Sequence, residues 1–486
     1  MAFICFVDNP RSELVMMLFA MWRKATFLVF CAVLLVVFET HAQQQIPVFA
    51  SKKDSVDYAQ VQQALQDLLR TNAGPIKREV YDSLMYVQNQ LRSRIIGFRV
   101  IYRPNREFTQ YNDIKDNPEK ASTLTQLSLS GKEWRKLPST IYNCQQLEEL
   151  ELVNTSLKKL PARLKKLPRL KAIYVLNYAS SKRLKLARNN QVKELIFRGI
   201  EAQLLPADYG RFMALEDLDL TGNIGLSAFP DIYRNTALKK LSLIGNQITL
   251  DDLPDKASSL EYLNVMGNKI TRVPEQIGNF SRLQRIIFSN NSLESIDPAI
   301  GKLSRLEELS FYNCGLSSLP ASIEQLTSLK QIDLYFNKLT TINISLDRLP
   351  ALEILYLSNN QLTSLPEEIG SLPNLRELYI SNNRLSYLPE SMGNLSQLKV
   401  FRINNNYFTT FPMELLKLTG LENLDISRND LRELPMELSQ FENLQIFALV
   451  DNPWDYPDDI LYLAELLRSK GTIVHLNTLD RAIDDR

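Results

Sequence analysis

Between residues 352 and 374 the chain carries a pattern of apolar and polar positions that fits neither one strand nor one helix. Leu355 and Leu357 alternate there with Tyr356 and Ser358. Successive side chains of a strand point to opposite faces, so this alternation indicates a short strand with one buried face and one solvent-facing side. The apolar positions that follow are spaced more widely, which predicts a return coil after the strand.

The same pattern returns along the chain at an almost constant spacing. Fifteen units begin with an apolar residue, and twelve of the fourteen intervals between them are 23 residues long, while two are 22. The units begin at Leu124, Leu147, Leu170, Val192, Leu215, Leu238, Leu260, Leu283, Leu306, Leu329, Leu352, Leu375, Leu398, Leu421 and Leu444. A fixed period of this size predicts a solenoid, in which each unit buries its apolar face against its neighbours.

The recurring residues of each unit read L-x-x-L-x-L-x-x-N-x-L, followed by x-x-L-P-x-x-I-x-x-L-x-x. This motif resembles the leucine-rich repeat family in its 23-residue class, and it covers about two thirds of the chain. The resemblance implies an α/β fold, a leucine-rich repeat solenoid or horseshoe with a parallel sheet of about fifteen strands on its concave face. Exported bacterial members of the family and intracellular members of the Ras group share this repeat class.

Asparagine occupies the ninth position in ten of the fifteen units, and the exceptions lie mostly in the first four units. The chain turns sharply after each strand, and a carboxamide can both donate and accept hydrogen bonds to backbone groups buried at that turn. These asparagines are therefore expected to form a structural ladder. They are Asn223, Asn246, Asn268, Asn291, Asn337, Asn360, Asn383, Asn406, Asn429 and Asn452.

The N-terminal 42 residues have the layout of a secretory signal peptide. The positive pair Arg23-Lys24 precedes an apolar run from Phe27 to Phe38, and small residues surround the expected cleavage site after Ala42. The run is shorter than the roughly 20 apolar residues that a membrane-spanning helix needs. We expect translation to begin at Met21 and no stable transmembrane span to remain after cleavage. The alternatives are an uncleaved N-terminal anchor or a cytoplasmic protein.

Residues 43–123 are predicted to form an N-terminal cap region and a connector. Helical spacing from Asp54 to Asn72 and again over residues 80–91 precedes a β-rich stretch at residues 95–102, and residues 105–123 are polar. A solenoid must shield the open core of its first repeat, so a cap is the favoured interpretation. A small partner-binding domain is the alternative.

The repeats are expected to span residues 124–452, and residues 453–486 to form a C-terminal cap. The apolar pattern predicts a helix from Asp458 to Ser469 that buries Ile460, Leu461, Leu463, Leu466 and Leu467 and ends before Gly471. A last strand is expected at residues 472–476, and the residues after Asp480 are expected to be frayed.

The composition argues against nucleic-acid binding and against catalysis. The net charge is +1 and the pI is about 7.6, so no basic field would attract nucleic acid. After cleavage the chain would keep one histidine, His475, and two cysteines, Cys144 and Cys314, which are expected to be packed thiols. No nucleophile with a base partner and no phosphate loop is recognisable, so we expect neither an enzyme nor a cofactor.

A metal site is not expected either. Asp217 and Asp219 share one strand face and could hold a divalent cation, but two carboxylates without further oxygen ligands are a weak signal. Alternating acids are also common on solvated strands.

The positions that the motif leaves free distinguish one repeat protein from another. The third, fifth, seventh and eighth residues of each unit are expected to face the concave side. Tyrosine is enriched in binding sites because it combines a large apolar face with a hydroxyl, and arginine offers donors to a carboxylate or a peptide carbonyl. The predicted ligand-binding residues are Tyr312, Asp333, Tyr335, Tyr356, Tyr379, Arg402 and Asp425, with Phe336 and Tyr407 near the same rim.

A purely structural interpretation of this group stands beside the functional one. Tyrosine is a good strand residue, and Arg402 could stack on Tyr379 and pair with Asp425 without any ligand. The favoured function is a non-enzymatic module that is exported to the periplasm, cell surface or extracellular space and binds a protein or peptide on its concave face. A glycan-binding surface protein and an intracellular signalling scaffold of the Ras-group type are the alternatives.

Overall fold

The computed structural model describes residues 105, 107–256 and 258–476, the backbone of residues 42–49 and 95–102, and the single positions 60, 61 and 87. The predicted signal peptide up to residue 41, most of the two predicted N-terminal helices and the predicted frayed terminus lie outside these residues. Strand β1 (Ala42–Phe49) pairs with β2 (Ile95–Tyr102) in antiparallel orientation. The predicted β-rich stretch at residues 95–102 is therefore a strand.

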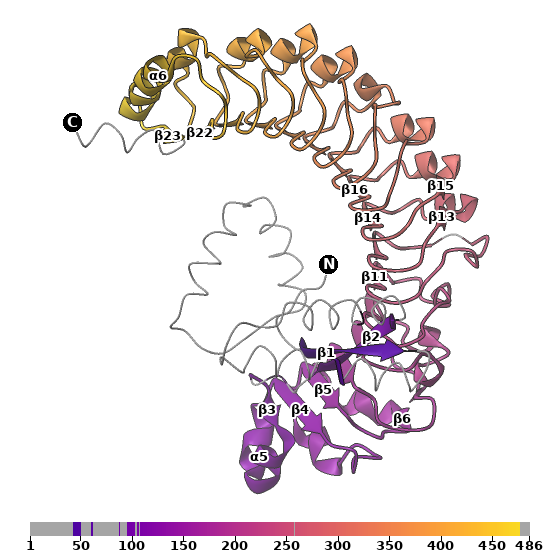
Figure 1. The fold of residues 1–486 in the computed structure, drawn as a ribbon. Coiled ribbons are helices and arrows are strands. Elements are labelled where there is room, and N and C mark those ends of the chain that lie inside the picture. The colour runs from indigo at the N-terminus through magenta and orange to yellow at the C-terminus, as the bar shows by residue number, and fades with distance from the viewer. Residues whose placement is uncertain are drawn as a thin grey trace.

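The described repeats form an open arc whose inner side is one parallel sheet of 17 strands (Figure 1). Each of the fifteen units contributes one strand, and β3 and β23 add one at either end, so the sheet is slightly larger than predicted. In order along the sheet the strands are β3 (Thr109–Gln110), β4 (Gln126–Ser130), β5 (Glu149–Val153), β7 (Ala172–Leu176), β9 (Glu194–Arg198), β10 (Asp217–Asp219), β11 (Lys240–Ser242), β12 (Tyr262–Asn264), β14 (Arg285–Ile287), β16 (Glu308–Ser310), β17 (Gln331–Asp333), β18 (Ile354–Tyr356), β19 (Glu377–Tyr379), β20 (Val400–Arg402), β21 (Asn423–Asp425), β22 (Ile446–Ala448) and β23 (Ile473–His475).

The outer side of the arc carries short helical turns, as the return coils of the sequence predict (Figure 1). The 3-10 helices that follow the strands are η3 (Ser139–Asn143), η4 (Ala162–Lys166), η5 (Ala202–Leu204), η6 (Tyr209–Arg211), η7 (Glu275–Asn279), η8 (Pro298–Lys302), η9 (Ala321–Gln325), η10 (Leu346–Arg348), η11 (Glu367–Ser371), η12 (Glu390–Asn394), η13 (Met413–Lys417) and η14 (Met436–Gln440). Two small parallel pairs also lie outside the main sheet, β6 (Lys159–Leu160) with β8 (Lys185–Leu186) and β13 (Arg272–Val273) with β15 (Ser295–Ile296).

One unit shows why the repeat folds in this way. Leu355 on β18 and Leu357 just after it point into the core, where both are almost fully buried. Pro366 sits at the N-cap of η11 in an extended conformation, and Ile369 of that helix is buried against the leucines. Stacking such units produces one continuous apolar core along the arc.

The segment that the sequence suggested as a polar connector, residues 105–123, is instead packed against the first repeat. It forms β3, α5 (Tyr111–Asp116) and η2 (Pro118–Ser122). Tyr111 and Ile114 of α5 are buried, and the hydroxyl of Tyr111 lies 2.6 Å from Oγ1 of Thr140. A few buried apolar residues are enough to pack this segment against the first repeat. Its mostly polar composition therefore suggested a linker.

At the other end of the sheet, α6 (Pro457–Ser469) and β23 lie where a helix and a strand were predicted. Ile460, Leu463 and Leu467 are buried as expected, and Ala464 joins them. Leu461 and Leu466 are only half-buried, because the buried stripe of the helix is narrower than the sequence suggested. Across the ranges that the structure describes, no helix has both the length and the apolar character for a membrane crossing.

Candidate functional site on the concave face

The ninth-position asparagines bind the backbone at the end of each strand. Nδ2 of Asn360 donates to the carbonyl oxygens of Leu334 and Leu357, each at 2.9 Å, and its Oδ1 accepts from the amide of Leu339 at 3.0 Å. Asn383 makes the same three contacts one repeat further on. These buried side chains hold consecutive units together and are not available to a ligand.

The residue at the eighth position of each described repeat has a left-handed backbone conformation. The sequence interpretation missed this feature, although its signal was present, since asparagine or glycine recurs at the position. The non-glycine residues there with positive φ are Asn154, Asn177, Asn290, Asn313, Phe336, Asn359, Asn382, Asn405, Arg428 and Asp451, with φ between 50° and 59°. Asparagine, aspartate and glycine tolerate this conformation best, so the eighth position is largely dictated by the backbone.

Tyr356 and Tyr379 stack on each other on the inner side of the arc. Their Cα atoms are partners in the register of β18 and β19, and the two rings are 4.8 Å apart with an interplanar angle of 15°. Arg402, the partner of Tyr379 in the register of β20, places its guanidinium carbon 5.5 Å from the centre of the Tyr379 ring. The register thus places an aromatic pair and a cation side by side.

The two tyrosine hydroxyls differ in their partners. The hydroxyl of Tyr379 donates to Oε2 of Glu377 at 2.6 Å, whereas that of Tyr356 makes no hydrogen bond within the described part of the chain. Burial, with the carboxylates of Glu377 and Asp333 nearby, raises the pKa of Tyr356 to about 12. At neutral pH this hydroxyl is protonated and can both donate and accept.

Arg402 has unused hydrogen-bonding capacity. Although Asp425 follows it in the register of β21, the described residues contain no ion pair between the two side chains. The Nε atom of Arg402 is buried and has no hydrogen-bond partner. The stacking on Tyr379 that a structural interpretation predicts is present, but the pairing with Asp425 is not.

The two aspartates of the predicted site have structural contacts of their own. Asp333 is only 5% exposed, and its carboxylate accepts from Oγ of Ser310 and from the amide of Tyr335, each at 3.0 Å. Asp425 accepts from the amide of Ser427 at 3.0 Å. An aspartate at the fifth position therefore accepts a hydrogen bond from the amide two residues later. Asp333 is buried under the concave surface and has a structural role there.

Tyr312 and Tyr335 form a second stacked pair, at the seventh position of neighbouring repeats. Their ring centres are 5.8 Å apart with an interplanar angle of 9°. Phe336 contacts both rings edge to face, at 5.6 Å and 4.7 Å, and is 39% exposed. We call these three residues the aromatic corner.

Of the two aspartates considered for a cation, Asp219 is engaged by other groups. Asp219 forms an ion pair with Arg198 and accepts from the amide of Thr221 at 2.7 Å. Burial raises the pKa of Asp217 to about 6. Within the ranges described, histidine, cysteine and acidic side chains nowhere gather in a group of three or more that could hold a metal ion. Cys144 and Cys314 are buried free thiols, as predicted.

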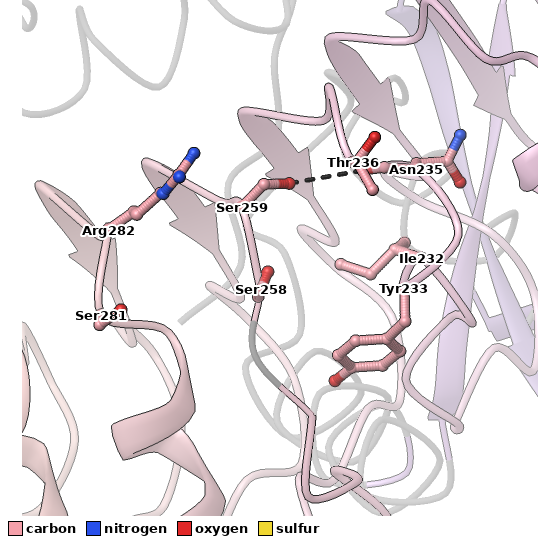
Figure 2. A pocket seen from close by; sticks show the side chains of 8 residues that line it. All are labelled: Ile232, Tyr233, Asn235, Thr236, Ser258, Ser259, Ser281 and Arg282. Carbon is pink, nitrogen blue, oxygen red and sulfur yellow. Dashed lines mark hydrogen bonds between the residues drawn. The ribbon is translucent and has the colours of Figure 1, made fainter.

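A separate pocket of about 430 Å³ is lined by residues from the segments that lead into β11, β12 and β14, among them Thr236, Ser259 and Arg282 (Figure 2). Oγ of Ser259 donates to the carbonyl oxygen of Leu238 at 2.6 Å, and Figure 2 shows its longer contact to the backbone of Asn235. The lining also includes Tyr233, whose buried hydroxyl has no partner. None of the predicted site residues belongs to this pocket.

Comparison with known proteins agrees with this architecture. Residues 343–481 match the leucine-rich repeat region family and residues 304–362 match the leucine rich repeat family. A leucine-rich repeat protein of Leptospira interrogans is similar at 24% sequence identity with a TM-score of 0.58, over 75% of this chain and 99% of that chain. A chain of the Toll–Spatzle complex of Drosophila is similar at 20% identity with a TM-score of 0.50, over 69% of this chain and 44% of that chain.

The repeat register, the asparagine contacts and these matches define a solenoid of parallel strands with short outer helices. The chain is a leucine-rich repeat protein.

Proposed function

We propose that this protein is a non-enzymatic, exported module that binds a protein or peptide on its concave face. The observation that carries the proposal is the group formed by Tyr356, Tyr379 and Arg402. These half-buried side chains lie side by side, and the free hydroxyl of Tyr356 and the guanidinium of Arg402 supply donors that the fold does not use.

The chemistry of this group suits a polypeptide. Tyrosine and arginine dominate the energetically important positions of protein interfaces. A solenoid of this kind also offers an extended concave surface, and such surfaces serve as binding sites in repeat proteins. The solved Toll structure, similar in fold, is a complex with Spatzle.

A glycan is a weaker candidate for the same surface. A sugar ring stacks on an open aromatic face, but both faces of Tyr379 are covered, one by Tyr356 and the other by Arg402. Export is proposed from the N-terminal signal pattern. N-terminal sequencing of the exported protein should begin at Gln43, and a retained Arg23 would contradict cleavage.

Site-specific photo-crosslinking tests the concave site. A benzophenone side chain replaces Tyr356 in one version of the full chain and Glu367, an exposed residue of η11 on the outer side, in the matched control. In the native cell we expect one discrete protein or peptide adduct at position 356 and none at position 367. Identical adducts at both positions, or none at position 356, would contradict the proposal.

A further inference from the structure

Phe336 is the one aromatic residue among the left-handed positions of the described repeats. Its φ is 57°, while asparagine occupies the same position in the repeats on either side, at Asn313 and Asn359. A bulky side chain disfavours this conformation, whereas asparagine tolerates it. The sequence therefore places a poorly suited residue where its neighbours carry a well suited one.

A backbone hydrogen bond of the repeat holds Phe336 in this conformation. Its amide donates to the carbonyl oxygen of Ser358 at 3.1 Å, and the amides of Asn313 and Asn359 make the equivalent bond to their own next repeats at 2.9 Å. The repeat imposes the same geometry in all three units. The conformational strain at position 336 therefore comes from the phenylalanine side chain, because the backbone contacts are the same in all three units.

Core packing does not account for this phenylalanine, because its ring is 39% exposed. Strained residues that the surrounding structure holds in place occur preferentially at functional sites. The plane of the Phe336 ring makes angles of 75° and 67° with the rings of Tyr312 and Tyr335. All three residues are at least partly exposed, so the aromatic corner presents an angled aromatic surface to solvent. The left-handed residues beside it, Asn313 and Asn359, are uncharged amides.

We infer that the aromatic corner is an anchor subsite for a large apolar or aromatic side chain of a bound peptide segment, with Phe336 as its specificity-determining residue. The inference rests on the proposed function and adds the class of side chain that the ligand presents. An apolar side chain fits because the open surface is aromatic and its flanks are neutral. The neighbouring carboxamides can pair with the peptide backbone on either side of that side chain.

The test uses random linear peptides displayed on phage and selected on the full chain. Enriched peptides are synthesised, and their dissociation constants are measured against the wild type, Phe336→Asn, Tyr356→Ala/Tyr379→Ala and Arg428→Asn. Arg428 is the matched control, since it is also an exposed left-handed residue at the eighth position, four repeats away.

We expect the enriched peptides to share a large apolar or aromatic residue and to lose about tenfold or more in affinity for Phe336→Asn, with Arg428→Asn unchanged. Replacing that peptide residue with alanine should cause the same loss and no further loss in combination with Phe336→Asn. The melting temperature of Phe336→Asn should be unchanged or higher, because asparagine suits the backbone there.

Several results would overturn the inference. Peptides that depend on Tyr356 and Tyr379 but not on Phe336 would leave the proposed function standing and remove the anchor. Selection of a cationic residue at the key position would contradict an apolar occupant, and a lowered melting temperature of Phe336→Asn would make the residue structural. A library without binders, or with binders insensitive to both sets of substitutions, would count against the anchor and the proposed function together.

Discussion

The rings of Tyr356 and Tyr379 lie parallel, 4.8 Å apart, on adjacent strands whose Cα atoms are register partners. The fold brings the two backbones to this spacing, since parallel strands lie about 4.8 Å apart. The stack is therefore a direct consequence of two tyrosines placed one repeat apart in sequence.

The stack should contribute a measurable coupling to stability. Free energies of unfolding in urea for Tyr356→Ala, Tyr379→Ala and the double variant should give a coupling of about 0.5 to 1.5 kcal/mol. Tyr356→Phe keeps the ring and should leave stability nearly unchanged, because its hydroxyl has no partner in the described residues. Additive single substitutions would show that the two rings do not interact.

Asn360 should contribute measurably to the stability of the stacked repeats. Asn360→Ala leaves two carbonyl oxygens and one amide without their partner, and should lower the free energy of unfolding by about 1 to 3 kcal/mol. Thr363→Ala, at an exposed position of the same unit, should change it by less than about 0.5 kcal/mol. Equal effects of the two substitutions in urea unfolding would argue against a structural ladder.

The buried carboxyl group of Asp333 should make stability depend on pH. Burial raises its folded pKa from 3.8 to about 6, so the folded state binds the proton more tightly than the unfolded state. The protonated carboxyl group therefore stabilises the folded state. This stabilisation is fully present below about pH 4 and is lost as the pH rises through about 6. The loss amounts to about 1 to 3 kcal/mol.

Asp333→Asn tests this dependence. An asparagine can still accept from the amide two residues later, as Asn264 accepts from the amide of Met266 at 3.0 Å. Urea unfolding at pH 4.5 and 7.5 should show a smaller decrease for the variant than for the wild type, and higher stability of the variant at pH 7.5. Asp347→Asn removes an exposed carboxylate and serves as the charge-matched control. The same pH dependence in wild type and Asp333→Asn would contradict the assignment.

The left-handed positions should discriminate strongly between substitutions. Asn359 has a φ of 58°, and glycine occupies the same position at Gly245 and Gly267. Asn359→Gly should therefore change stability by less than about 1 kcal/mol, whereas Asn359→Val should cost about 1 to 3 kcal/mol through backbone strain. Thermal unfolding of the two variants provides the comparison. Equal melting temperatures would show that the position does not require a left-handed conformation.

Much of the fold follows from the spacing of a few residues. Leu355 and its counterparts every 23 residues predict the strand, the solenoid and the parallel register, because stacked units can bury their apolar faces only in that way. The side-by-side placement of Tyr356, Tyr379 and Arg402 follows from the same register. Strand β3 could not be predicted, since a polar segment such as Thr109–Gln110 carries no alternation of its own.

The contacts of individual side chains were less accessible from the sequence. That Asp333 is buried beneath Ser310 and Tyr335, and that Arg402 does not pair with Asp425, depends on rotamers that periodicity does not specify. The left-handed conformation of Phe336 could have been predicted, because the neighbouring repeats carry asparagine at the same position.

The central claim is that the concave face binds a protein or peptide. It is tested most directly by measuring how tightly the partner captured at position 356 binds the full chain and its variants. Calorimetry should show a loss of about 30-fold or more for Tyr356→Ala/Tyr379→Ala, in keeping with tyrosines at the centre of an interface. The control is Tyr387→Ala/Tyr462→Ala, which removes two tyrosines that are 57% and 58% exposed outside the strands of the sheet and should leave the affinity unchanged. Equal affinities of wild type and both double variants would contradict a binding site on the concave face.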